Sequence, residues 1–144
     1  MKNLIYLILF LLVTTFALSS FTNKGLEGYE DRAYSQDPSN GKIQYERNCL
    51  MCHKINGEGA AKSFPPLAKS DYLNADPERA IRIVLYGLYE PIVVNGKPYE
   101  NYMIPHKDLS DKDIADILTY VYGSWGNNKT KISPEMVKKQ RTKK

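Results

Sequence analysis

Both cysteines of the chain stand in one short string, CLMCH, in which Cys49, Cys52 and His53 occupy the first, fourth and fifth positions. On a helical turn, residues three and four apart lie on the same face, so both sulfurs and the imidazole would point to one side. The C-x-x-C-H spacing is the attachment signature of c-type haem. The string therefore predicts one covalent haem c, bonded through Cys49 and Cys52, with its iron ligated by His53.

Three other uses of these residues fit the sequence less well. A structural zinc site needs four ligands, usually in two spaced pairs, and only His106 remains as a further candidate. A disulfide between Cys49 and Cys52 would have poor geometry. A thioredoxin-like dithiol is expected in a βαβ context, which the helix-rich pattern does not provide. Thiol–disulfide oxidoreduction is kept as the alternative to haem chemistry.

A haem iron that only transfers electrons needs a second axial ligand, and two side chains downstream qualify. Met103 lies in a turn-rich stretch before the last strong helix, where a loop could close over the haem. Thioether ligation opposite histidine raises the reduction potential and suits electron transfer. His106 is the rival ligand. If Met103 did not bind the iron, a gas-binding or peroxidatic haem protein would be indicated instead.

Residues typical of helix starts and helix ends occur along the chain around the candidate haem residues. Apolar residues at three- and four-residue intervals indicate amphipathic helices, and the Asn95-Gly96 pair is typical of a tight turn. The expected elements are a helix over residues 41–48 with Ser39 as N-cap, a loop over 57–72, a helix from Asp76-Pro77 to near Gly87, a turn or small hairpin at Asn95-Gly96, a helix over 110–123 capped by Ser110, and a short basic helix from Ser133-Pro134.

The length of 144 residues corresponds to about one domain. Residues 1–20 indicate a signal peptide or an uncleaved N-terminal anchor, because a basic start precedes an apolar stretch. We expect a polar linker over 21–38, the folded domain over 39–128, and a basic, solvated tail with a short helix over 129–144. The formal charge of +4 arises in that tail. No basic helix with base-reading residues appears, so nucleic-acid binding is not expected.

Residues from about 41 to 127 resemble class I monohaem cytochromes c, the small helical electron carriers. Gly41 and Tyr45 match the glycine and the aromatic of that family's N-terminal helix, which crosses the C-terminal helix at close range. Ile117 and Tyr120 match the partner positions. The resemblance implies an all-α cytochrome c fold, in which three main helices and connecting loops wrap one covalent haem.

The resemblance also implies roles around the haem. Pro65 is similar to the family proline whose carbonyl accepts the proton of the ligand histidine, and Leu67 would pack on the ring. The stretch through Met103 resembles a bacterial subset that occurs free and as domains fused to periplasmic dehydrogenases or copper nitrite reductases. In that subset proline usually follows the ligand methionine directly, whereas here Ile104 precedes Pro105.

The implied function is one-electron transfer by a haem c that cycles between ferrous and ferric iron, without catalysis. The expected partners are redox proteins, namely a dehydrogenase, a reductase or a terminal oxidase, and a haem subunit of such a complex is the alternative to a free carrier. The expected location is periplasmic or otherwise exported, with anchoring to the inner membrane left open. The candidates to surround an exposed haem edge and favour an acidic docking face are Lys54, Lys62, Lys69, Lys97 and Lys107.

Overall fold

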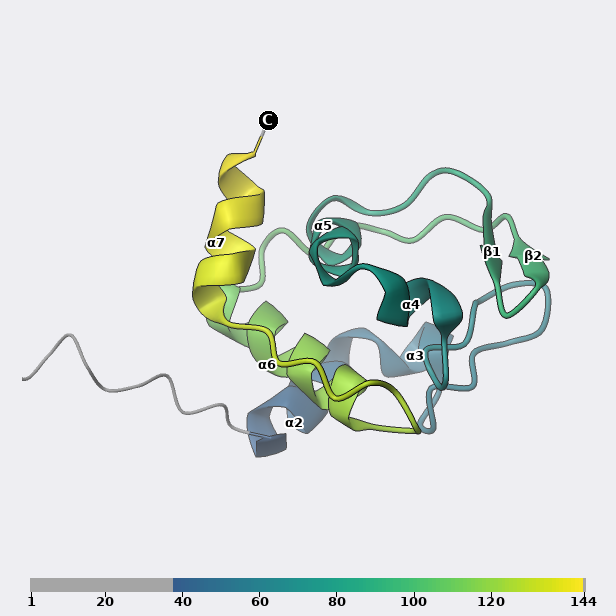
Figure 1. The fold of residues 1–144 in the computed structure, drawn as a ribbon, viewed down its shortest axis with the longest axis horizontal. Helices are drawn as coiled ribbons and strands as arrows, with labels where there is room; N and C mark the ends of the chain where they lie inside the picture. The colour runs from purple at the N-terminus through teal and green to yellow at the C-terminus, as the bar shows by residue number, and fades with distance from the viewer. Residues whose placement is uncertain (1–37, 144) are drawn as a thin grey trace, which may run out of the picture. The chain divides into compact units, whose positions relative to one another are not determined.

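The computed structural model describes residues 38–143, and these form one compact unit. The predicted signal peptide or anchor and nearly all of the predicted linker lie outside them. Within 38–143, no helix is long and apolar enough to cross a membrane. In chain order the elements are α2 (Pro38–Asn48), α3 (Leu50–His53), α4 (Asp71–Ala75), α5 (Pro77–Tyr86), β1 (Ile92–Val94), β2 (Lys97–Tyr99), α6 (Asp111–Gly123) and α7 (Pro134–Thr142) (Figure 1).

The crossing of α2 and α6 is the most extensive contact between elements of the fold (Figure 1). Gly41 lies at this contact: a Cβ there would meet the Asp116 carbonyl oxygen at 2.3 Å and Tyr120 Cβ at 2.9 Å. Only a residue without a side chain allows the backbones to come this close. The close helix crossing that Gly41 predicts is therefore confirmed.

Aromatic rings fill the space beside this crossing. Tyr45 of α2 is fully buried, and its ring centre lies 5.6 Å from that of Tyr120 and 5.3 Å from that of Trp125. The last two rings contact each other edge to face at 5.6 Å. Such tilted pairs add to the free energy of burial. This cluster holds the end of α2, and hence the start of the cysteine motif, against α6.

The predicted starts of α5, α6 and α7 are confirmed by their caps. The side chains of Asp76, Ser110 and Ser133 each accept a hydrogen bond from the backbone amide three residues later, at 3.0, 3.0 and 3.4 Å. A cap of this kind stabilises a helix by about 1 kcal/mol. The turn at Asn95-Gly96 is also confirmed, since it joins β1 to β2 with both residues at positive φ.

Two local predictions are wrong. Among the described residues α2 begins at Pro38, so Ser39 lies inside the helix and not at its N-cap. The loop expected over residues 57–72 ends earlier, because Ser70 caps the additional helix α4 by accepting a 3.1 Å bond from the Leu73 amide. A helix of 5 residues is too short to show an apolar period in the sequence.

The end of the chain differs from the solvated tail expected. Ile132 and Val137 are fully buried, and α7 packs against both α5 and α6 (Figure 1). The Ile132 amide also donates to the Thr119 hydroxyl of α6 at 3.0 Å. The density of lysine and arginine conceals these apolar positions in the sequence. The segment is therefore part of the folded unit, and its basic side chains lie around a buried stripe.

Candidate haem site

The cysteine motif begins at Cys49, the N-cap residue of α3, and continues through that helix, which directly follows α2. The Cys49 amide donates to the Tyr45 carbonyl at 2.8 Å, and the Cys49 carbonyl accepts from the His53 amide at 2.9 Å. The Tyr45 hydroxyl then donates to the Lys54 carbonyl at 2.6 Å. Burial raises the pKa of Tyr45 above its ordinary range, so this hydroxyl stays a neutral donor. Tyr45 thus links α2 to both ends of the motif.

Cys49, Cys52 and His53 line a cavity of about 330 Å³. This volume falls in the range of ~300–1,000 Å³ that is common for sites of small ligands and cofactors. The lining comes from every helix and strand of the described residues except α7. It is mostly aliphatic and aromatic, with Phe64, Leu67, Ile83, Leu88, Leu118 and Val121 among its members. A large apolar group held at one side by two sulfurs and an imidazole fits this lining.

His53 is 9% exposed, and one hydrogen bond orients its ring. Its Nδ1 lies 3.1 Å from the carbonyl oxygen of Pro65. A carbonyl can only accept, so Nδ1 carries the proton and Nε2 keeps a free lone pair. Burial lowers the pKa of His53, which favours the neutral ring. A neutral imidazole with an available Nε2 is the form that ligates iron.

The loop with Pro65 and Leu67 folds back toward α3. The Gly57 carbonyl accepts bonds from the Leu67 and Ala68 amides at 2.7 and 2.9 Å. Gly59 permits the close approach, because a Cβ there would lie 2.3 Å from a carbonyl oxygen of the same loop and its φ is +67°. Pro65 and Leu67 both line the cavity. The packing of Leu67 on a porphyrin stays a prediction.

The thiols of Cys49 and Cys52 are half-buried and are not joined to each other. Burial raises the pKa of the Cys49 thiol to about 12, and the neighbouring Cys52 adds to the effect. A redox-active dithiol has the opposite property, a lowered pKa that yields thiolate at neutral pH. This environment argues against thiol–disulfide exchange as the function.

Met103 reaches the same cavity from the loop between β2 and α6. Its backbone pairs with Leu88, just after α5, in both directions at 2.9 and 3.0 Å. Gly87 makes this pairing possible, since a Cβ there would lie 2.6 Å from the Met103 carbonyl oxygen. The Met103 side chain is half-buried. Its bond to an iron stays a prediction.

His106, the rival ligand, lines the cavity as well. Its amide donates to the Val84 carbonyl of α5 at 2.8 Å. Burial lowers the pKa of His106 and favours its neutral form. Between the two candidates, the Ile104 side chain is 68% exposed. The fold therefore brings both candidate ligands, Met103 and His106, to the cavity that His53 lines.

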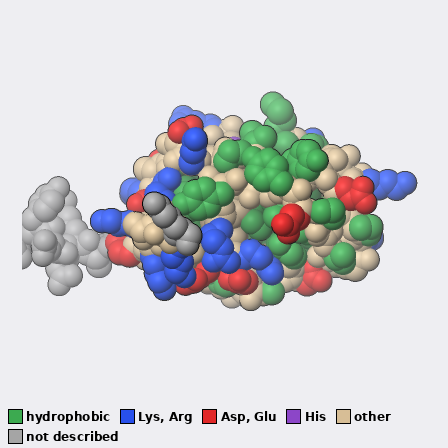
Figure 2. Space-filling model, turned by 90° about the horizontal axis from the view of Figure 1, so that it is seen from above, with side chains coloured by type: hydrophobic (Ala, Val, Ile, Leu, Met, Phe, Trp, Pro, Cys, Tyr) green, Lys and Arg blue, Asp and Glu red, His purple; other side chains and the backbone are tan. Residues whose placement is uncertain are grey.

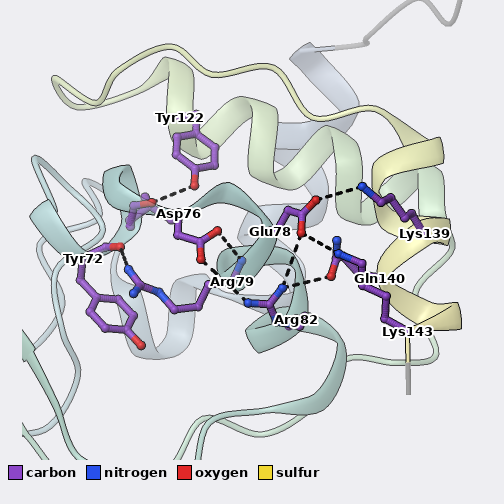
Figure 3. A network of polar contacts seen from close by, with 10 residues as sticks. Tyr72, Asp76, Glu78, Arg79, Arg82, Tyr122, Lys139, Gln140 and Lys143 are labelled. Atoms are coloured by element: carbon purple, nitrogen blue, oxygen red, sulfur yellow. Dashed lines mark hydrogen bonds and ion pairs between the residues drawn. The ribbon is translucent and has the colours of Figure 1, made fainter.

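The sequence did not single out two polar side chains of the cavity, Tyr72 and Arg79. The Arg79 guanidinium lies 3.7 Å from the centre of the Tyr72 ring and donates to the Tyr72 carbonyl (Figure 3). Among residues 38–143 it forms no ion pair with an acidic side chain. A cation at an apolar wall suits the carboxylates that every haem carries. Nothing in the spacing of Arg79 marks it as facing a cavity.

The outer side of the loop with Met103 is apolar. Tyr102 and Ile104 are 69% and 68% exposed, and the Tyr102 ring contacts that of Tyr89 at 5.8 Å. Figure 2 shows hydrophobic side chains gathered on one face of the molecule. The five lysines predicted to surround a haem edge are all exposed, but none lines the cavity: Lys54, Lys62, Lys69, Lys97 and Lys107.

Comparison with known proteins gives one consistent answer. A family model described as Cytochrome c matches residues 38–125. Cytochrome c-552 of Thermus thermophilus is 36% identical over 105 residues, which cover 67% of this chain and 80% of that protein. The match extends over most of the length of both proteins.

Subunits of larger enzymes are also similar. The cytochrome c subunit of the quinone alcohol dehydrogenase of Gluconobacter oxydans is 34% identical over 105 residues, 71% of this chain but 22% of that subunit. The cytochrome c subunit of gluconate 2-dehydrogenase from Pantoea cypripedii is 33% identical over 94 residues, 63% and 21% of the two chains. The chain belongs to the cytochrome c family, and it transfers electrons through a covalently attached haem c for which Cys49, Cys52 and His53 form the C-x-x-C-H site.

Proposed function

We propose that the chain is a one-electron carrier whose haem iron is ligated by His53 and Met103. The observation that carries this proposal is that both side chains line one apolar cavity while belonging to different elements, α3 and the loop after β2. His53 offers a free Nε2, because Pro65 binds its Nδ1. The Met103 backbone is bound to Leu88, which leaves the thioether as the group available to the cavity.

The bound haem c supplies an iron that gains and loses one electron. The chain supplies its surroundings: two thioether links from Cys49 and Cys52, an oriented imidazole, and an apolar lining that excludes water. Thioether ligation and burial both raise the reduction potential. Arg79 is proposed to face the haem carboxylates. With His53 and Met103 both bound to the iron, no position on it would remain open for a substrate, so we propose a carrier and not an enzyme.

Export is part of the proposal. Residues 1–20 have the basic start and apolar stretch of a signal peptide or N-terminal anchor, and residues 21–38 are polar. We place the domain outside the cytoplasm, in the periplasm or held at the inner membrane. This placement is supported by the sequence pattern alone. The mass of the mature chain recovered after export distinguishes a cleaved signal from a retained anchor.

The proposed partners are redox proteins. Two similar proteins are cytochrome c subunits of dehydrogenases, and another is a cytochrome c-552 of similar length. The chain could therefore deliver electrons as a free carrier or act as a subunit of a dehydrogenase. Copurification of the tagged, exported protein distinguishes these two arrangements, because a dedicated subunit remains with its enzyme through gel filtration.

The experiment that tests the ligation compares Met103→Ala with His106→Ala as a matched pair. Both variants truncate a cavity side chain on the same loop. We expect Met103→Ala to lose the methionine-to-ferric-iron charge-transfer band and to bind carbon monoxide rapidly in the ferrous form. We expect His106→Ala to keep the band. If the unaltered protein lacks the band and only His106→Ala gains rapid carbon monoxide binding, His106 is the ligand. If the unaltered protein lacks the band and itself binds carbon monoxide rapidly, the iron is open and binds gas.

A further inference from the structure

The segment that carries Met103, residues 100–110, is called the ligand loop below. Its middle is tied to the end of α5 by the two bonds between Met103 and Leu88 and, three residues downstream, by the bond from the His106 amide to the Val84 carbonyl. These bonds hold residues 103–106 of the loop. The downstream end of the loop, just before α6, is held by a different element.

Arg141 of α7 holds that downstream end with all three guanidinium nitrogens. Nη1 donates to the Lys107 carbonyl at 2.8 Å, Nη2 donates to the Leu109 carbonyl, and Nε donates to the Asp111 carboxylate at 2.5 Å. The Arg141 and Asp111 side chains are only 28% and 29% exposed, so water competes weakly. Charge-assisted bonds of this kind are about twice as strong as neutral ones. A lysine cannot reproduce such a planar fork.

The same helix also holds α5, which anchors the middle of the ligand loop through Val84. Glu78 of α5 accepts bonds from Lys139 at 3.3 Å and Lys143 at 2.8 Å, and Arg82 donates to the Gln140 side chain at 3.1 Å (Figure 3). These contacts are mostly at the surface, and each is worth little by itself. Together with Arg141 they connect α7 both to α5 and to the downstream end of the ligand loop.

We infer that Arg141 is a positioning residue for Met103, because its fork closes the downstream end of the ligand loop and so keeps the thioether at the iron. This inference rests on the proposed ligation by His53 and Met103. Arg141 does not line the cavity and acts only through the loop. Without the fork, the downstream end is released while α2, α5 and α6 keep their packing. The thioether then leaves the iron in a local opening that does not need global unfolding.

The test uses the full, haem-loaded chain and two readouts that separate loop opening from unfolding. Helix content is followed by circular dichroism during heating, and the methionine-to-ferric-iron band is followed in parallel. Carbon monoxide binding to the ferrous form at 25 °C reports how often the iron is uncovered. The variants are Arg141→Gln, which removes the fork, and Arg141→Lys, which keeps the charge. Lys138→Gln, an exposed position on the same helix, is the matched control.

For Arg141→Gln we expect carbon monoxide to bind about tenfold faster or more, as the loss of a charge-assisted bond implies, and the band to disappear at a lower temperature than the helix signal. Arg141→Lys should lie close to Arg141→Gln, and Lys138→Gln close to the unaltered protein. If the band and the helix signal of Arg141→Gln disappear together, with no change in carbon monoxide binding, Arg141 has only a structural role. If the unaltered protein lacks the band, or Met103→Ala keeps it, the proposed ligation fails instead.

Discussion

Replacement of Gly41 by alanine tests the helix crossing that positions the cysteine motif. A Cβ at this position would lie 2.3 Å from the Asp116 carbonyl oxygen and 2.9 Å from its carbonyl carbon. These are backbone atoms of α6 and cannot rotate away. Ordinary van der Waals contact begins near 3.4 Å, so α2 and α6 would have to separate by about 1 Å locally.

Gly123 provides the matched control, since it is also a helical glycine. A Cβ added at Gly123 meets nothing within 4 Å, and its φ is not positive. Alanine there should raise the free energy of unfolding by up to about 1 kcal/mol through helix propensity. Gly41→Ala gains the same helix propensity, but overpacking lowers its free energy of unfolding by typically ~1–3 kcal/mol, and by more where the opposing atoms belong to the backbone. We expect Gly41→Ala to be less stable than Gly123→Ala by about 3 kcal/mol.

Thermal unfolding of the two haem-loaded variants, followed by circular dichroism, measures this difference. For a domain of ~100 residues, 1 kcal/mol shifts Tm by about 4–8 °C, so the two midpoints should differ by at least about 10 °C. A Gly41→Ala protein as stable as Gly123→Ala would refute the reasoning. It would mean that α2 and α6 can separate at no cost, and that the crossing does not fix the cysteine motif.

Other predictions concern the core, the surface and the cavity. Tyr122→Phe should lower the free energy of unfolding by ~1–3 kcal/mol in urea denaturation, since it leaves the buried Leu73 carbonyl without its 2.9 Å donor. The Lys143 ammonium, with smaller help from its neighbours, lowers the pKa of Glu78 to about 2. Because the folded-state pKa is depressed, the contribution of the Glu78 carboxylate to the free energy of unfolding is complete above about pH 4.5 and is lost as the pH falls toward 2. Glu78→Gln should remove this part of the pH dependence when the free energy of unfolding is measured between about pH 5 and pH 2. Arg79→Gln should lower the midpoint potential by roughly 40 mV, as loss of a nearby cation worth about 1 kcal/mol favours the ferric state, and an unchanged potential would place Arg79 away from the haem.

The sequence was most informative for features that depend only on residues close together in the chain. Asp76, Ser110 and Ser133 cap helices as predicted, because a side chain that accepts from the amide three residues later acts locally. The C-x-x-C-H string needs no tertiary context to be recognised. Gly41 was identified through resemblance, and the structure supplies its reason in the contact with the α6 backbone.

Residues whose role depends on tertiary packing could not be found in this way. Arg79 lines the cavity beside Tyr72, whose ring and carbonyl its guanidinium contacts, and no pattern of the sequence marks this pair. The helix α4 is too short to show an apolar period of its own. Val137 lies in a basic segment whose composition indicates solvent exposure, yet it is fully buried. Arg141 gains its partners from a loop more than thirty residues away. For Val137 and Arg141 the deciding contacts are with residues distant in sequence.

The intact mass of the exported protein, produced together with the haem maturation machinery and then denatured, is the measurement that tests the account most directly. We predict one species that keeps the mass of a single haem under denaturing conditions, with neither Cys49 nor Cys52 open to alkylation. Colourless protein that lacks this added mass and is alkylated at both cysteines would contradict the account.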